Sequence, residues 1–165
     1  MFRKRIVLAM ALLALGLSAC AGEDKTGGSA SPAPAEEIVY EKGFYDLERD
    51  PNMSWRWMEP EGVVRLKNSG KDMTLKLAGR APLERFKQPP VINISLNGVQ
   101  LEQVTGTPEG LDREYTISAA QQGKGEWSEL KITSDQSFVP KEVDKGGTDP
   151  RRLAFSLTNL TWQPK

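Results

Sequence analysis

Cys20 carries the only thiol in the 165-residue chain, and it ends the run Leu17-Ser18-Ala19-Cys20. A basic segment at residues 3–5 and an apolar segment at residues 6–17 precede this run. A basic start, an apolar segment and small residues before a cleavage point are typical of a secretory signal peptide. As a helix, the apolar segment would reach about 18 Å, well short of the roughly 30 Å of hydrocarbon in a bilayer. It is therefore not expected to cross the membrane alone.

With a cysteine at its end, this four-residue run resembles the lipobox of bacterial lipoproteins. The resemblance implies that residues 1–19 are removed and that Cys20 is the lipidation site, anchoring the chain in the membrane through a thioether. More than one acyl chain is needed to hold a protein stably. Ala21 rather than Asp follows the cysteine, which implies an outer-membrane location, facing the periplasm or the cell surface. The alternative is an ordinary secretory signal with a cysteine near its cleavage site by chance.

The residue types that most active sites use are missing. The chain has no histidine, and its one cysteine would be occupied by lipid. This excludes Ser-His and Cys-His nucleophilic sites and most zinc or copper sites. The acidic residues show no spacing that would set two carboxyl groups across a cleft, as glycoside hydrolysis requires. We therefore expect no catalytic residues, no metal and no cofactor.

The charge balance argues against a nucleic-acid partner. The chain has 22 basic and 22 acidic residues, and removal of a signal peptide with three basic residues leaves 19 against 22, a net charge of about −3. Such a surface gains nothing from the phosphates of a nucleic acid. Membrane binding is left to the lipid on Cys20.

The rest of the chain divides into a tether and one domain. Residues 20–37 are rich in Gly, Ser, Ala, Pro and charge without apolar periodicity, which predicts a flexible linker. Residues 38–165 are long enough for a single domain.

Apolar residues alternate with polar ones through most of this domain, as in half-buried antiparallel strands. No window shows a sustained helical stripe, so only a turn or two of helix is expected, near residues 83–86. Many short strands predict an all-β fold, an antiparallel two-sheet β-sandwich of jelly-roll or Greek-key type. The alternating residues are Val64, Leu66, Met73, Leu75, Leu77, Ile92, Ile94, Leu96, Tyr115, Ile117, Leu130, Ile132, Leu153, Phe155 and Leu157.

Two local features predict how the strands are joined and bent. Asn97-Gly98 between apolar residues favours a two-residue type I′ hairpin turn. In the last strand the apolar positions change parity between Leu157 and Leu160. One extra residue near Thr158-Asn159 would return both to the same face, so a β-bulge is predicted there.

Several short motifs, in this order, resemble a β-sandwich module attached to bacterial glycosyltransferases and methyltransferases of surface-polysaccharide pathways. That module is similar in outline to galactose-binding-like jelly rolls. The resemblance implies an accessory domain that faces carbohydrate and has no active site of its own. The motifs are Gly43-Phe44-Tyr45 with Glu48, Arg56-Trp57, Phe138-Val139-Pro140 and Asp149-Pro150-Arg151-Arg152-Leu153.

Trp55 and Trp57 share one face of an expected strand and are candidates for ligand binding. A flat indole can stack on the apolar face of a pyranose, while Glu48, Arg56 or Asp149 bonds its hydroxyls. The alternative is that the tryptophans fill the core; we favour this for Trp57 and leave Trp55 open.

Asp149 and Arg151 lie after a glycine-rich loop and are also candidates. The guanidinium could clamp an anionic sugar. An ion pair that pins the loop to the last strand is the favoured alternative. Trp127, after another turn, is a candidate for either sugar contact or strand packing.

These observations support two hypotheses. The first is a non-catalytic, lipid-anchored envelope protein whose β-sandwich binds carbohydrate, such as envelope polysaccharide. The second is an assembly or scaffolding lipoprotein whose sandwich docks an envelope protein, for example at an exposed strand edge.

Overall fold

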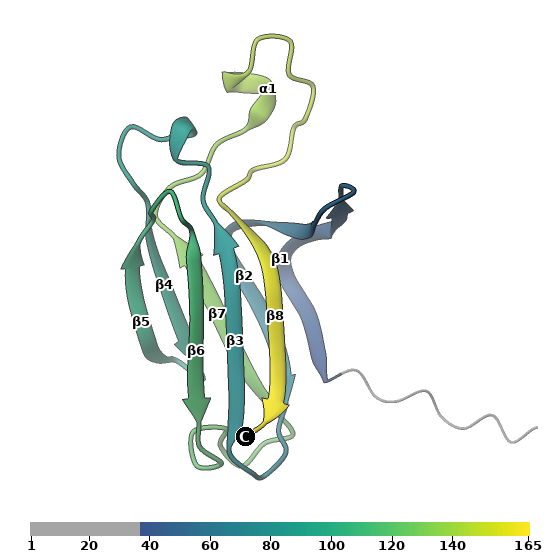
Figure 1. Cartoon of the computed structure of the whole chain (residues 1–165), viewed down its shortest axis with the longest axis vertical. Helices are drawn as coiled ribbons and strands as arrows, with labels where there is room; N and C mark the ends of the chain where they lie inside the picture. Colours follow the sequence, from purple (N-terminus) through teal and green to yellow (C-terminus); the bar gives the residue numbers. More distant parts are fainter. Residues whose placement is uncertain (1–36) are drawn as a thin grey trace, which may run out of the picture. The chain divides into compact units, whose positions relative to one another are not determined.

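The computed structural model describes residues 37–165, which form eight strands and two short helical turns (Figure 1). The predicted signal peptide, Cys20 and all but the last residue of the predicted tether lie outside the described residues. The elements are β1 (Ile38–Arg49), β2 (Ser54–Lys67), β3 (Met73–Arg80), the 3₁₀ turn η1 (Leu83–Arg85), β4 (Val91–Leu96), β5 (Val99–Thr105), β6 (Leu111–Ile117), β7 (Trp127–Ser134), α1 (Pro140–Val143) and β8 (Phe155–Pro164).

All strand pairs are antiparallel, and the strand order is β5-β4-β7-β2-β8-β3-β6, with β1 paired to β2. The prediction of an all-β antiparallel fold with little helix is confirmed. Two separate sheets are not seen, because backbone hydrogen bonds join seven strands in one path and attach β1 to β2, which makes one eight-stranded sheet. The sheet instead curls, so that β3, β6 and β8 lie in front of β4 and β7 (Figure 1).

The sheet turns its corner within β2. The second half of this strand, from Glu61, pairs with β7, whereas the segment from Arg56 to Met58 pairs with β8. Gly43 of β1 and Gly62 of β2 allow the bend: a Cβ on Gly43 would lie 1.9 Å from the Glu61 carbonyl oxygen. Glycines at such points permit a close backbone approach that no other residue allows.

The core lies inside the curl and is made of the alternating apolar residues. Nearly all of those that we expected to face inward are buried, including Leu75, Ile94, Leu130 and Phe155. Trp162 is also buried, with its indole nitrogen donating to the Lys67 carbonyl at 2.7 Å.

The predicted turn, bulge and helical turn are all present. Asn97 and Gly98 have φ of 50° and 78°, as a type I′ turn requires, and they join the paired residues Leu96 and Val99. Ala78 pairs with Asn159 but Gly79 pairs with Leu157, which leaves Thr158 as the extra residue of a bulge. The 3₁₀ turn η1 occupies the expected place, whereas α1 had no sequence signal.

Side chains close the two ends of the curl. The end strands β5 and β6 share no backbone pairing among the described residues. Glu102 of β5 instead accepts hydrogen bonds from the Tyr115 hydroxyl at 2.7 Å and from Arg113 Nε at 3.0 Å, both on β6. Burial raises the pKa of Tyr115, so its hydroxyl remains a donor. Burial opposes ionisation of Glu102, but the bonds from Tyr115 and Arg113 keep its pKa below the ordinary value.

We expect Glu102→Gln to lower the free energy of unfolding by about 1 kcal/mol at neutral pH, since a partly exposed charged hydrogen bond is lost. A carboxylate whose pKa is lowered by folding stabilises above its unfolded pKa, and this contribution disappears as the pH falls through the folded value. Urea unfolding of both proteins at pH 7 and pH 3 should therefore show a difference at pH 7 that shrinks at pH 3.

Glu114→Gln is the matched control for this change. It removes an ion pair with Lys76 whose two side chains are 60% and 50% exposed, and such a pair contributes little. An equal loss of stability in both variants would contradict the closure of the curl by Glu102.

Candidate functional site

A cavity of about 600 Å³ opens on the outer face of the curl, where β2, β8 and β3 lie side by side. Its size is within the range of small-ligand sites. The floor comes from these strands, and the walls come from the β1–β2 turn, the segment around η1 and the loop before β6. The lining residues are Asp50, Met53, Trp55, Trp57, Arg80, Ala81, Pro82, Leu83, Glu84, Pro108, Ser156 and Thr158.

Trp55 and Trp57 both line this cavity, and both are half-buried. The favoured core position for Trp57 is therefore wrong. The reason is strand parity: Met58, the next residue, is fully buried, so Trp57 must face outward. The two indoles thus lie together on the floor of this cavity, which we call the tryptophan cavity, and each is partly exposed to solvent.

The ring of Trp57 is held in place by a chain of aromatic contacts. It meets Phe138 edge-on at 6.3 Å between ring centroids, and Phe138 meets Phe86 in the same way at 6.1 Å. Phe138 belongs to the loop between β7 and β8, and its backbone pairs with Leu153. Phe138 of this loop therefore contacts Trp57 without itself lining the cavity.

The charged residues of the cavity wall differ in their partners. One carboxylate oxygen of Asp50 accepts the backbone N–H groups of Asn52 and Met53 at 2.7 and 2.8 Å, which fixes the β1–β2 turn. Glu84 lies 3.7 Å from its neighbour Arg85. Arg80 is exposed at the end of β3 and has no ion-pair partner within residues 37–165.

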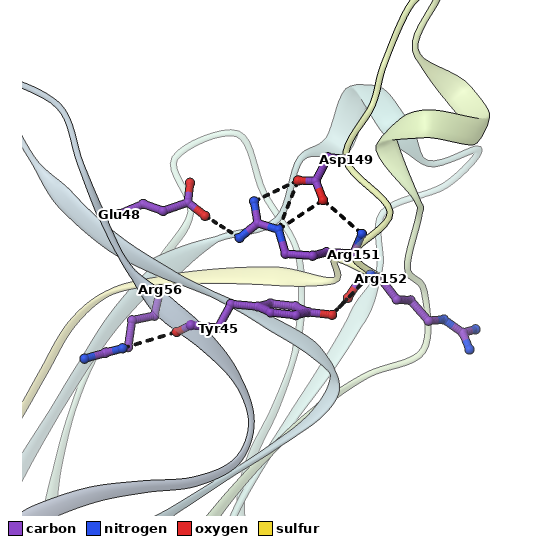
Figure 2. Close-up of polar contacts among 6 residues, drawn as sticks. All are labelled: Tyr45, Glu48, Arg56, Asp149, Arg151 and Arg152. Atoms are coloured by element: carbon purple, nitrogen blue, oxygen red, sulfur yellow. Dashed lines mark hydrogen bonds and ion pairs between the residues drawn. The ribbon is translucent and has the colours of Figure 1, made fainter.

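Glu48, Asp149 and Arg151 form a compact ion-pair cluster beside the cavity (Figure 2). Arg151 Nη2 lies 2.7 Å from Asp149, and Nη1 lies 2.5 Å from Glu48. The hydrogen bond from Arg151 lowers the pKa of Asp149, and the bond to Asp149 raises the pKa of Arg151. The expected ion pair between Asp149 and Arg151 is present, but it lies within the segment before β8, and the link to another strand is the pair of Arg151 with Glu48 of β1.

Tyr45 of β1 also contacts the segment before β8. Its ring lies 5.1 Å from the guanidinium of Arg151, and its hydroxyl accepts the backbone N–H of Arg152 at 3.2 Å (Figure 2). Arg56 points elsewhere: its guanidinium covers the ring of Tyr40 at 4.5 Å and donates to the Tyr45 carbonyl at 3.2 Å. Arg56 thus lines a smaller hollow of about 380 Å³ rather than the tryptophan cavity.

Trp127 lies at the opposite end of the sheet, where β7 begins opposite Lys67. Its half-buried ring is flanked by Arg65 at 4.9 Å and Lys67 at 5.0 Å. Lys67 also pairs with Glu126. Trp127 is therefore separate from Trp55 and Trp57.

Of the seven ligand-binding candidates, the structure brings only Trp55 and Trp57 into the cavity; Glu48, Asp149 and Arg151 lie beside it as one cluster. Sequence reasoning missed Arg80 and the wall around η1. Arg80 continues the alternation of β3 as a polar residue, and this pattern carries no sign of a ligand site.

Within the part of the chain that the structure describes, no cluster of three or more Asp or Glu side chains is suited to a metal ion. The helical turns of residues 37–165 are too short to cross a membrane. No protein-family model and no curated protein matches the sequence.

Proposed function

We propose that the protein is a non-catalytic lipoprotein of the cell envelope, anchored through Cys20, whose β-sheet domain binds carbohydrate in the tryptophan cavity. The single observation that carries the binding proposal is the pair Trp55 and Trp57, half-buried side by side on the cavity floor. An indole offers a large apolar surface at low conformational cost, which matches the C–H face of a sugar ring.

The polar groups of the wall complete such a site. Thr158 and Glu84 line the same cavity as the tryptophans and can bond the hydroxyls at the rim of a stacked ring. Aromatic contacts hold Trp57 before any ligand arrives, so binding requires little ordering of the floor. Envelope polysaccharide is the partner that this chemistry and the proposed anchor both favour.

Substitution of the tryptophans tests this proposal. We expect Trp55→Ala or Trp57→Ala in the full-length protein to weaken saccharide binding about tenfold, the equivalent of about 1.4 kcal/mol for one lost stacking contact. The double variant should lose binding. Calorimetric titration with purified envelope polysaccharides, preceded by a glycan array to select them, measures the effect.

Trp127→Ala is the control, because it removes another half-buried indole, at the other end of the sheet. It should bind as the unsubstituted protein does. Equal weakening by Trp127→Ala, or no saccharide bound by the unsubstituted protein, would count against the proposal.

The second candidate function is docking of an envelope protein. The observation that favours it is strand β1, which pairs only with β2, so that its other backbone edge has no strand partner among residues 37–165. An open edge can accept an added strand. Specific co-purification of one envelope protein, without any response to saccharides, would reverse the order of the two candidates.

A further inference from the structure

We propose that the tryptophan cavity selects acidic saccharides, and that Arg80 binds their carboxylate. This inference rests on the proposed function, since it names the class of sugar for the same site. It also moves the anionic-sugar role from Arg151, which the sequence suggested, to a different arginine.

Arg80 is available to a ligand, whereas Arg151 is not. Arg151 already bonds two carboxylates, at 2.7 and 2.5 Å, so an anionic ligand would have to displace its own acidic partners. Arg80 has no carboxylate within ion-pair distance among residues 37–165. A guanidinium without a partner presents a planar fork that matches a carboxylate.

The acidic residues of the same wall have hydrogen-bond or ion-pair partners of their own. Asp50 holds the two backbone N–H groups of its turn, and Glu84 lies next to Arg85. Asp50 is thus engaged by hydrogen-bond donors of its own turn, whereas Glu84 shares Arg85 with Asp144 and is 71% exposed to solvent. Arg80 is the basic residue among those that line the cavity, and an anionic ligand can neutralise its charge.

Arg80 also lies on the same face of the sheet as Trp57. Ser156 of β8 pairs with Trp57 on one side and with Arg80 on the other, so the three side chains share one face of the sheet. Trp57 and Arg80 are thus two strand spacings apart, about 10 Å between backbones. Ser156 between them is small and buried, and its hydroxyl donates a hydrogen bond to the Arg80 carbonyl at 3.1 Å.

This spacing suits a uronic acid. A pyranose ring stacked on Trp57 would lie over Ser156, and its carboxylate substituent would then be within reach of the long Arg80 side chain. A neutral sugar can stack in the same place but gives Arg80 no ion partner. The cavity should therefore discriminate by charge as well as by ring shape.

The test compares each acidic saccharide with its uncharged ester. The full-length protein is titrated with trisaccharides of galacturonate, glucuronate and mannuronate, and with their methyl esters. We expect at least one acid to bind ten or more times more tightly than its ester, with a preference that falls as salt is added. Arg80→Gln should remove this preference, and Arg80→Lys should keep part of it.

Lys124→Gln is the control, because it removes one positive charge from the exposed turn before β7, at the far end of the sheet. It should keep the full preference. Thermal unfolding of each variant verifies that this exposed substitution leaves the fold intact.

Equal affinity for acids and esters, or a preference that survives Arg80→Gln, would overturn the inference. If neutral sugars bind and Trp55→Ala weakens them, the carbohydrate proposal stands while the acidic selection fails. If no saccharide binds at all, both fail.

Discussion

Gly43→Ala is expected to reduce the free energy of unfolding by about 3 kcal/mol or more, and to lower the melting temperature by roughly 10 °C. Gly43 has a φ of +72°, which costs an alanine about 1 to 2 kcal/mol. In addition, the new Cβ would lie 1.9 Å from the Glu61 carbonyl oxygen, and this neighbour is backbone that cannot rotate away. Denaturant unfolding followed by circular dichroism measures the loss.

Gly70→Ala separates the two causes. Gly70 has almost the same φ, +71°, but a Cβ there would meet nothing within 4 Å. Its substitution should therefore show the backbone cost alone. A loss as large as that of Gly43→Ala would mean that the close approach at the corner of the sheet contributes nothing.

Cys20→Ser is expected to abolish lipid attachment, and with it either processing of the chain or its retention in the membrane fraction. A serine hydroxyl cannot form the thioether that the lipobox resemblance implies, and a chain processed at Cys20, with a net charge of about −3, would gain no attraction to anionic headgroups. Metabolic labelling with palmitate, cell fractionation and the intact mass of the protein measure the effect.

Ser18→Ala is the matched control, because it keeps a small residue in the run before the cysteine. It should leave labelling and fractionation unchanged. An unaltered mass and membrane fraction in Cys20→Ser would instead favour the ordinary secretory signal.

The strands could be predicted because their signal is local. Alternation of apolar and polar residues in segments such as 73–77 and 92–96 predicts which face of the strand is buried. Asn97-Gly98 predicts the turn that joins two strands. The bulge at Thr158 was predictable for the same reason, since a change of parity within one strand is visible in the sequence.

The corner of the sheet and the cavity were not predictable, because both depend on register between distant segments. Gly43 looks like any glycine until β1 lies against Glu61. Arg80 joins Trp57 only because β8 pairs with both of their strands. For Trp57 itself, size favoured the core, but its place next to the buried Met58 decided the matter.

Both ends of the described domain lie away from the cavity. The start of β1 and the end of β8 lie toward the same end of the sheet (Figure 1). β1 begins opposite Leu66 and β8 finishes opposite Met73, whereas the cavity lies where β1 finishes and β8 begins. At about 3.3 Å per residue, the 12 residues of β1 would span at most roughly 40 Å, and they span less because β1 bends at its register shifts. A bead, sensor chip or fused carrier coupled at either end would therefore leave the mouth of the hollow facing the surrounding solution.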